Sequence, residues 1–366
     1  MNYKGKNNTE IKVLVVDDSA FMRKVVGEML EEESGIKVIE KARNGRDALL
    51  KVEKYDPDVI TLDVEMPKMD GLEFLQRLME KKSTPVIMLS SLTGKQSETT
   101  IKALELGAFD FVLKPSGSIS LDIEKVQEEL ITKVKLAAKV KNKESNNKTR
   151  KLFKTIDDKR VKSKRKEIKS ISKSANSTPL NKKLLVIGAS TGGPRAIKDV
   201  VTLLPKDINA DIIIVQHMPA GFTTSLAERL DGLSHIKVKE AQEGDRLEKG
   251  KALLAPGGYH MLVKRGKVTL SKEDKVHNVR PAIDVTIKSI IEEYGSNTVG
   301  VLLTGMGKDG AEGLKMIKGA GGQTIAQDED TSVVYGMPKV AYNIGAVDVV
   351  KPIGSIAKEI IRMLKS

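Results

Sequence analysis

The stretch LLVIGASTGGPRAIKDV, residues 184–200, decides the fold of the second half of the chain and raises its main functional question. A short apolar run typical of a buried strand leads into a cluster of small residues, and apolar residues at helical spacing follow. This strand–turn–helix order is the repeating unit of doubly wound α/β folds. The glycine-rich turn either holds a phosphate group or presents Ser190 as a nucleophile, and the two alternatives predict different proteins.

The sequence after this turn continues the same alternation. Apolar runs that predict strands occur at 211–217 and 298–305, and weaker ones follow further on. Segments with helical periodicity fill several of the gaps, and a short antiparallel hairpin is expected around 251–271. We therefore expect residues 181–366 to form a Rossmann-like α/β domain with a mostly parallel sheet.

The first half of the chain alternates in the same way. Five apolar runs, each followed by an amphipathic segment, predict a (βα)5 domain over residues 10–130. The runs are KVLVVDD (12–18), IKVIEKA (36–42), DVITLDV (58–64), PVIMLS (85–90) and DFVLKP (110–115). The fold class expected for the chain is thus α/β, with two doubly wound domains.

A strongly basic segment between the halves is expected to be a flexible linker over residues 131–180. The chain carries a formal net charge of +13, and residues 131–183 contain 19 Lys or Arg against 4 Asp or Glu. This excess of 15 positive charges leaves a net charge of −2 on the rest of the chain. Few aromatics and little apolar periodicity predict a solvated, self-repelling tether. Contact with an acidic partner, such as nucleic acid or anionic lipid, is the alternative.

Polar side chains stand at the predicted carboxyl ends of strands in the first half: Asp17, Asp18, Asp63, Ser90 and Lys114. A single acidic residue after a strand is usually a turn former or a helix cap. Here five polar residues converge, because the ends of parallel strands meet at one edge of the sheet. Three carboxylates offer the oxygen ligands that Mg²⁺ prefers, and the Lys and Ser side chains suit a phosphoryl group.

The turn at residues 188–194 fits a nucleophile better than a phosphate loop. Ser190 stands where the dinucleotide fingerprint G-x-G-x-x-G requires its second glycine, and no lysine follows the glycines as a P-loop demands. Residues 188–192 match G-x-S-x-G instead, which places a serine on a sharp strand-to-helix turn. The match is short, so a structural Gly-Ser turn is the alternative unless a base and an orienting acid accompany it.

Candidates for that base and acid follow two other predicted strands. His217 ends an apolar run, whereas the other three of the four histidines lie in segments that look less anchored. Asp309 follows another buried run and precedes a helix. Each has a structural alternative, as a hydrogen-bonded strand-end residue and as a helix N-cap. Together with Ser190 they would supply a nucleophile, a general base and an orienting acid at one sheet edge.

The first half resembles the receiver domain of response regulators from residue 11 to about 130. Four separated segments carry the resemblance in the family's order: VVDD, TLDVEMPKMDG, LSS and LKP. It implies that Asp63 is the residue that becomes phosphorylated. It also implies that Asp17 and Asp18 bind Mg²⁺ together with the Asp63 carboxylate and the backbone carbonyl of Glu65.

The same resemblance assigns three further residues and a partner. Ser90 would hydrogen-bond the acyl phosphate, Lys114 would pair with it, and Phe111 occupies the position of a switching aromatic. The phosphodonor would be a chemotaxis histidine kinase. The new charge on the aspartyl phosphate can bias a packed surface between two arrangements.

The second half resembles the catalytic domain of chemotaxis protein-glutamate methylesterases. The segments that carry this resemblance are IGASTGGPRAI, VQHMPAGFTTSLAERL, LAPGGYHM, VRPAIDV, LTGMGKDGAEGL and AQDEDTSVVYGMPKVA. It implies hydrolysis of glutamyl methyl esters on the cytoplasmic part of methyl-accepting chemoreceptors, with release of methanol, and deamidation of specific receptor glutamines. No cofactor is expected for the ester hydrolysis.

This resemblance also suggests roles for residues around the nucleophile. Ser190, His217 and Asp309 would form the catalytic triad, and the backbone N–H groups near Thr191 and Met306 would stabilise the oxyanion. Arg280 would grip the acidic receptor surface, with a solvated surface arginine as the alternative.

Composition restricts the remaining classes of protein. The absence of cysteine excludes disulfides, thiol nucleophiles and cysteine-ligated metal centres. No apolar run approaches the roughly 20 residues of a membrane span, so we expect a soluble cytoplasmic protein that is not inserted in a membrane. The main rival is a receiver joined to a binding module whose basic tether contacts nucleic acid. The tether lacks a helix-turn-helix or zinc pattern, so no nucleic-acid partner is expected.

Overall fold

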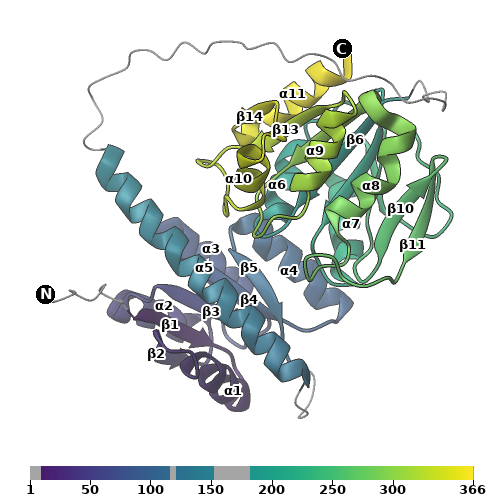
Figure 1. Ribbon diagram of the computed structural model, residues 1–366. Helices are drawn as coiled ribbons and strands as arrows, with labels where there is room; N and C mark the ends of the chain where they lie inside the picture. The colour runs from purple at the N-terminus through teal and green to yellow at the C-terminus, as the bar shows by residue number, and fades with distance from the viewer. Residues whose placement is uncertain (1–9, 116–120, 152–181, 366) are drawn as a thin grey trace, which may run out of the picture.

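The computed structural model describes residues 10–115, 121–151 and 182–365 and arranges them as two α/β domains, each built on a parallel sheet (Figure 1). The expected α/β class with two domains is therefore confirmed. Most of the expected flexible linker, from residue 152 to 180, lies outside the described residues, and so does its alternative as a binding segment.

The first domain has a five-stranded sheet with the order β2-β1-β3-β4-β5, and all neighbouring strands are parallel. The strands are β1 (Ile11–Val16), β2 (Ile36–Ala42), β3 (Val59–Asp63), β4 (Val86–Ser90) and β5 (Asp110–Leu113). The helices are α1 (Ala20–Glu31), α2 (Gly45–Tyr55), α3 (Gly71–Lys81), α4 (Gly94–Leu106) and α5 (Leu121–Lys151). Strands β3 and β4 are buried throughout, which explains their continuous apolar runs.

Side-chain caps fix the start of three of these helices. The side chains of Ser19, Asn44 and Asp70 each accept the backbone N–H of the third residue that follows. Such a cap satisfies a donor that the first helical turn leaves unpaired and contributes about 1 kcal/mol. Because each cap follows a strand closely, the caps also fix the loops at the carboxyl edge of the sheet.

Helix α5 differs from the expected linker. It continues through residues 131–151, where a flexible segment was predicted from residue 131 onward. Leu130, Val134 and Ala137 are almost completely buried and belong to a core cluster with the strands of the first sheet. Their spacing is helical, but lysines occupy much of the remaining sequence. The prediction of a flexible linker from residue 131 was therefore wrong, because the excess of charge outweighed the weak amphipathic pattern.

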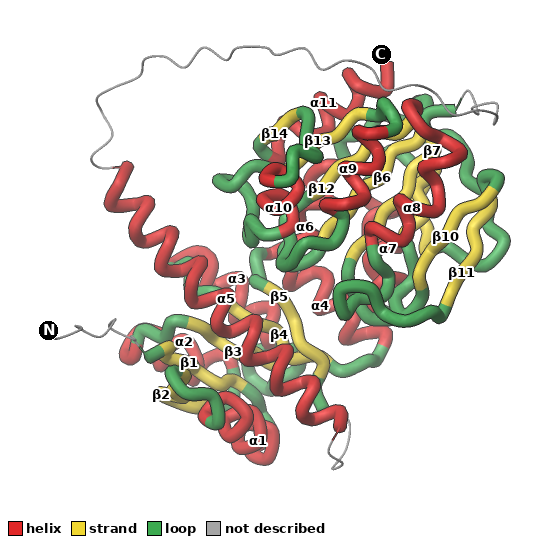
Figure 2. Tube along the Cα trace, viewed as in Figure 1, coloured by secondary structure: helices red, strands yellow, loops and turns green. Residues whose placement is uncertain are grey.

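The second domain has a seven-stranded sheet with the order β14-β13-β12-β6-β7-β9-β8, again parallel throughout (Figure 2). The strands are β6 (Leu184–Ala189), β7 (Asp211–Gln216), β8 (Lys237–Glu240), β9 (Lys251–Leu254), β12 (Thr298–Leu302), β13 (Gln323–Gln327) and β14 (Val349–Lys351). From β6 the chain proceeds to β7 on one side, and β12 later pairs with the other side of β6. This reversal is the topological switch point at which sites of α/β sheets usually lie.

Helices cover both faces of this sheet. One core cluster includes residues of α6 (Gly193–Val201), α7 (Phe222–Leu233) and α11 (Ile353–Lys365). The other includes residues of α8 (Ile283–Tyr294), α9 (Ala311–Gly319) and α10 (Met337–Asn343). The antiparallel hairpin is formed by β10 (His260–Lys264) and β11 (Lys267–Ser271), whereas β9, at the start of the expected hairpin region, belongs to the parallel sheet.

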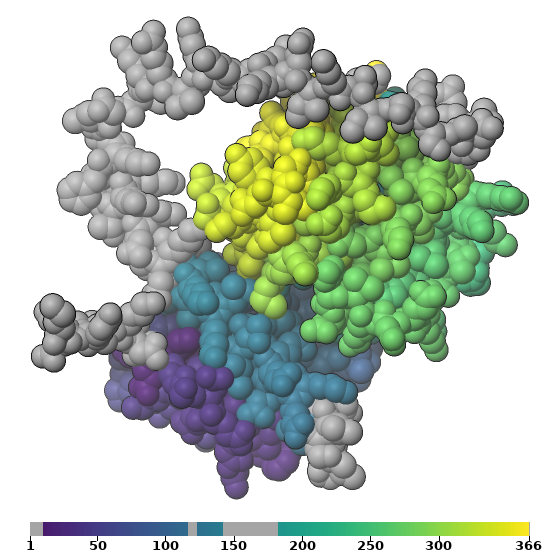
Figure 3. Space-filling view, in the orientation of Figure 1, coloured from purple at the N-terminus to yellow at the C-terminus, as the bar shows by residue number. Residues whose placement is uncertain are grey.

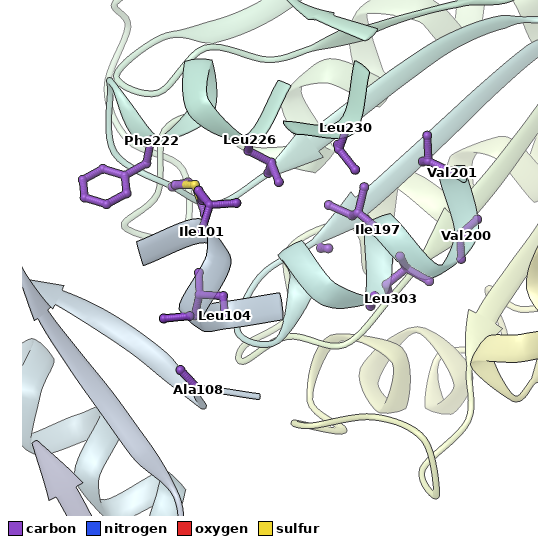
Figure 4. Close-up of a cluster of buried hydrophobic side chains, with 14 of the residues drawn as sticks. Ile101, Leu104, Ala108, Ile197, Val200, Val201, Phe222, Leu226, Leu230 and Leu303 are labelled. Atoms are coloured by element: carbon purple, nitrogen blue, oxygen red, sulfur yellow. The ribbon is translucent and has the colours of Figure 1, made fainter. Parts of the chain in front are cut away.

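The two domains pack against each other along a broad face (Figure 3). Helix α4 of the first domain lies on α6 and α7 of the second, where Ile101 and Leu104 meet Ile197 and Leu226 (Figure 4). These residues form part of one continuous cluster of buried apolar side chains. Removal of this apolar surface from water stabilises the docked arrangement.

No helix in the described part of the chain is both long enough and apolar enough to cross a membrane.

Candidate active site

Three neighbouring strands of the second domain end at the candidate active site. Strands β12, β6 and β7 are adjacent and parallel, so their carboxyl ends lie at one edge of the sheet. The register pairs Ala189 with Gln216, and the next residues along these strands are Ser190 and His217. Asp309 lies in the connection from β12 to α9. The topology therefore brings the three predicted residues to the same edge.

Hydrogen bonds to both neighbouring strands hold the turn that carries Ser190. The Ser190 backbone N–H donates to the carbonyl of Thr304, which follows β12, over 3.0 Å. The Ser190 carbonyl accepts hydrogen bonds from the Gly193 N–H over 2.7 Å and from Nε2 of Gln216, the last residue of β7, over 3.0 Å. The position of Ser190 is thus set by the sheet itself.

Two glycines leave room for this turn. Gly192 has a φ of +77° and caps α6, and a Cβ atom there would lie 2.6 Å from a side-chain carbon of Val333. A Cβ atom on Gly305 would lie 2.7 Å from the Cβ of Ser190. Glycine alone tolerates the left-handed conformation of the first and the close approach at the second.

His217 and Asp309 are joined by a short hydrogen bond, with 2.7 Å between Nε2 and Oδ2. The ring nitrogen left for a hydroxyl group is therefore Nδ1. Within the described residues, the Ser190 hydroxyl makes no hydrogen bond to this imidazole, so only one of the two contacts of a triad is formed.

Asp309 is held on both carboxylate oxygens. Its Oδ2 accepts the backbone N–H of Ile283 over 2.7 Å, and its Oδ1 accepts that of Asp284 over 3.0 Å. Burial acts against its charge, but the hydrogen bond and the attraction of His217 together with these N–H groups lower the pKa of Asp309. The N-cap of α9 is Gly310, so Asp309 caps the start of α8 and not that of the helix that follows it.

The candidate oxyanion donors flank Ser190. Thr191 directly precedes Gly192, the N-cap of α6, so its backbone lies at a helix N-terminus, where negative charge is stabilised. Met306 follows Gly305, the residue that approaches Ser190. Both predicted residues thus lie on loops adjacent to the serine.

Arg280 is engaged within its own loop. Its Nη1 donates to the backbone carbonyls of Lys272 and Glu273 over 2.7 and 2.8 Å. In this structure the guanidinium holds the segment that precedes α8.

A second group of predicted residues meets at the carboxyl edge of the first sheet. Asp17 and Asp63 are buried, Asp18 is exposed, and carboxylate oxygens of the three lie within 4.8 Å of one another. Lys114 Nζ lies 2.8 Å from Asp17 Oδ2 and 2.7 Å from Asp63 Oδ1. Such a set of hard oxygen donors at the end of strands β1 and β3 fits a Mg²⁺ ion with water and phosphate oxygens as further ligands.

Burial and like charge perturb this group. Burial, with the charge of Asp17 as a smaller contribution, raises the pKa of Asp63 to about 6 against the opposing effect of Lys114. Burial of Lys114 disfavours its charge, but the hydrogen bonds to Asp17 and Asp63 raise its pKa overall. Two buried carboxylates with one ammonium group leave an excess of negative charge, which a cation would neutralise.

The side chains of Ser90 and Glu65 both hydrogen-bond to helix α4 of the first domain. The hydroxyl of Ser90 accepts a hydrogen bond from Thr100 Oγ1 of α4 over 2.8 Å. The Glu65 carboxylate accepts one from Gln96 Nε2 over 3.1 Å. Both contacts connect the carboxyl edge of the first sheet, where Asp63 lies, to α4, the helix that packs on the second domain.

The structure also shows a direct link between the two domains that the sequence did not reveal. Thr191, next to Ser190, donates its hydroxyl hydrogen bond to Asp110 of β5 over 2.7 Å, and both residues are buried. The rings of Phe111 and Phe222 stack with centroids 4.4 Å apart. Sequence periodicity cannot predict such contacts, because they depend on how the domains dock.

An ion pair and a cavity complete the boundary between the domains. The Arg229 guanidinium of α7 forms a bidentate pair with Glu105 of α4, with contacts between 2.9 and 3.2 Å.

A cavity of about 580 Å³ also lies between the domains. Among the described residues that line it are Gly192 and Thr304 but none of the three predicted triad residues. The cavity therefore adjoins the loops on either side of Ser190 but does not reach the predicted triad itself.

Two histidines that looked less anchored in the sequence have defined partners. His260 is buried, its Nδ1 accepts the Ala282 N–H over 3.2 Å, and its Nε2 lies 3.0 Å from the carbonyl of Asp274. His277 Nε2 lies 3.3 Å from an oxygen of Asp284. No apolar run precedes His277, and a glycine pair precedes His260, so the strand-end signal that marked His217 was missing.

Comparison with known proteins identifies both domains. Residues 185–360 match the family model of the CheB methylesterase, and residues 13–124 match that of the response regulator receiver domain. A protein-glutamate methylesterase/protein-glutamine glutaminase of Symbiobacterium thermophilum is 48% identical over 96% of this chain and 96% of its own length. The protein of the same name from Pyrococcus horikoshii is 46% identical over 97% of this chain and 94% of its own length.

Among solved structures, the crystal structure of the Thermotoga maritima CheB methylesterase catalytic domain is 46% identical and covers 50% of this chain and 99% of that chain, with a TM-score of 0.49. The sheets, the matched domains and the clustered strand-end residues define a response regulator with an enzymatic output domain. The chain belongs to the family of CheB methylesterases, the protein-glutamate methylesterase/protein-glutamine glutaminases.

Proposed function

We propose that this protein is a cytoplasmic enzyme of chemotactic adaptation that hydrolyses glutamyl methyl esters on chemoreceptors, releases methanol, and deamidates specific receptor glutamines. The observation that carries this proposal is the 2.7 Å hydrogen bond between His217 and Asp309 at the strand ends that adjoin Ser190. The names of the relatives support the choice of substrate.

In the proposed reaction, Ser190 Oγ attacks the ester carbonyl carbon while His217 takes the hydroxyl proton. His217 then gives this proton to the departing methanol, and a glutamyl ester of Ser190 remains. Water attacks this acyl-enzyme with His217 as base, which frees the glutamate and regenerates the serine. With a glutamine substrate the same steps release ammonia.

Asp309 has a supporting role in these steps. Its carboxylate receives Nε2–H of His217, so the imidazole is held in one tautomer and its positive charge is stabilised when it carries the second proton. The two backbone N–H groups that bind Asp309 keep it ionised and oriented. The N–H groups of Thr191 and Met306 are our candidates for the oxyanion site, where one donor typically contributes about 2.7–4 kcal/mol to the transition state.

We also propose that Asp63 accepts a phosphoryl group from a histidine kinase. Asp17, Asp18 and Asp63, with the carbonyl of Glu65, would hold the Mg²⁺ ion that neutralises charge on the incoming phosphate. Lys114 would bind a phosphate oxygen, and Ser90 would hydrogen-bond another. For Ser90 to do so its hydroxyl must leave Thr100, which would couple phosphorylation to helix α4.

In the unphosphorylated protein, the receiver domain would restrain the esterase site. Asp110 binds Thr191, and α4 packs on α6, the helix that begins directly after the serine turn. Movement of α4 and β5 on phosphorylation would release this turn and expose it to receptor.

Methanol release from methylated chemoreceptor tests the proposed activity. Ser190→Ala should reduce the rate by at least roughly a thousandfold, because the nucleophile is removed. Ser225→Ala is the matched control, because among the described residues the Ser225 hydroxyl bonds only to the carbonyl of Gly221, the N-cap of α7. Methanol release by Ser190→Ala at the wild-type rate would refute the proposal.

A further inference from the structure

A second pair of histidine and carboxylate lies directly behind Asp309. His277 Nε2 is 3.3 Å from Asp284 Oδ2, and one side-chain ligand atom each of His277, Asp284 and Asp309 lie within 4.8 Å of one another. On its other side Asp309 binds His217 over 2.7 Å. Four titratable side chains therefore form one continuous row that ends at the proposed base.

The start of α8 fixes Asp284 in this row. Its backbone N–H donates to Asp309 Oδ1 over 3.0 Å, while its own Oδ1 accepts the N–H of Gly313 in α9 over 2.7 Å. His260 accepts the N–H of Ala282, the N-cap of α8. The Asp284 side chain is thus held between two helices and cannot turn to solvent without breaking these contacts.

The charges around Asp284 are unbalanced. The titratable groups that face it are Asp309, from the loop before α9, and His277, from the segment before α8; α9 itself contributes the Gly313 N–H. Burial, and then the charge of Asp309, raise the pKa of Asp284 to about 6. In neutral and alkaline solution two negative charges therefore stand side by side behind His217.

We propose that Asp284 is a positioning residue for the ester hydrolysis: its charge, held beside Asp309 by Gly313 and His277, stabilises the protonated form of His217 and makes it a stronger base. This inference rests on the function proposed above. Asp284 does not touch the reacting atoms and acts through Asp309.

The pH dependence of kcat/KM for methanol release tests this role. Asp284→Asn preserves the shape and the acceptor for Gly313 but removes the charge, so the acid limb should move to lower pH by roughly half a unit or more. Asp284→Glu retains the charge and should return the limb toward that of the wild type. Asp274→Asn, an exposed residue of the preceding loop, should leave it unchanged. If the acid limb of the kcat/KM profile of Asp284→Asn coincides with that of the wild type, or if Asp274→Asn shifts it equally, the inference is overturned.

The two levels of failure can be told apart. Full activity of Ser190→Ala removes the proposed function itself. An inactive Ser190→Ala, together with an acid limb of Asp284→Asn that coincides with that of the wild type, leaves the function standing and removes only the role of Asp284.

Discussion

Ser190 sits on a turn whose neighbouring residues must be small. Gly305 is one of these neighbours, because the backbone after β12 passes directly over the serine. The sequence shows the glycine but not what it approaches. Only the pairing of β12 with β6 explains why a side chain is excluded there.

Gly305→Ala should impair both folding and ester hydrolysis. The new Cβ would lie 2.7 Å from Ser190 Cβ and 2.4 Å from Met337 Sδ, so the serine turn must shift. We expect a loss of about 1–3 kcal/mol in unfolding free energy and a fall in kcat. Gly232→Ala in α7 is the control, because its Cβ would meet nothing within 4 Å, and activity should persist. Equal behaviour of the two variants in denaturation and methanol assays would refute the steric argument.

Asp63 makes a pH-dependent contribution to stability. Its pKa is raised from the usual 3.8 to about 6, so folding favours the protonated carboxyl group. The stability that this proton supplies is complete below about pH 4 and is lost as pH rises through 6. Asp63→Asn should therefore stabilise the domain by about 1–3 kcal/mol at pH 8, and by about half as much at pH 5.

Calorimetry at both pH values, with divalent cations chelated, measures this difference. Addition of Mg²⁺ should then stabilise the wild type more than Asp63→Asn, because the variant lacks one carboxylate ligand. A stabilisation that does not change between pH 5 and pH 8 would show that burial of the Asp63 charge is not its cause.

At the scale of elements, helix α4 connects the two sites. Thr100, in the middle of this helix, hydrogen-bonds to Ser90, and the apolar face of the helix packs on α6 and α7. The amphipathic pattern predicts the helix but not its second partner, because a face buried against a receiver sheet and one buried against another domain look alike in sequence. The extension of α5 was missed for a related reason, since its few buried residues are diluted by lysines.

The ion pair between Glu105 and Arg229 is a specific clamp between α4 and α7. Glu105→Gln should weaken docking and raise the basal methanol release of the unphosphorylated protein by roughly two- to fivefold, since a partly exposed pair contributes at most about 1 kcal/mol. Glu73→Gln is the control, because it breaks a pair with Arg77 on α3, away from the second domain. Basal rates that are equal in both variants would argue against restraint through α4.

At the scale of the whole molecule, the sequence predicted the fold class of both domains and the sheet edge at which each group of candidate residues lies. An apolar run followed by Asp63, Ser190 or His217 was a sufficient signal for this edge, because the carboxyl ends of parallel strands converge there. The interface between the two domains was not predictable in this way. Contacts such as Asp110 with Thr191 join residues without periodic or motif signals and arise only from docking.

Phosphorylation should act across this boundary in the full-length protein. A small-molecule phosphodonor with Mg²⁺ should increase methanol release by the wild type and leave Asp63→Asn at its basal rate. Under the proposed regulation, new charge at Asp63 would draw the Ser90 hydroxyl away from Thr100 and so release the packing of α4 on the second domain. An increase of the same size in Asp63→Asn would exclude Asp63 as the site that controls activity.

The most direct test of the central claim is a kinetic cycle of Ser190→Ala, His217→Ala and the double variant in the methanol-release assay. If the two side chains act as one unit, the double variant should be no slower than the slower single variant, because either change alone already disables the nucleophile. Losses that multiply in the double variant would mean that Ser190 and His217 act independently, and would contradict the account.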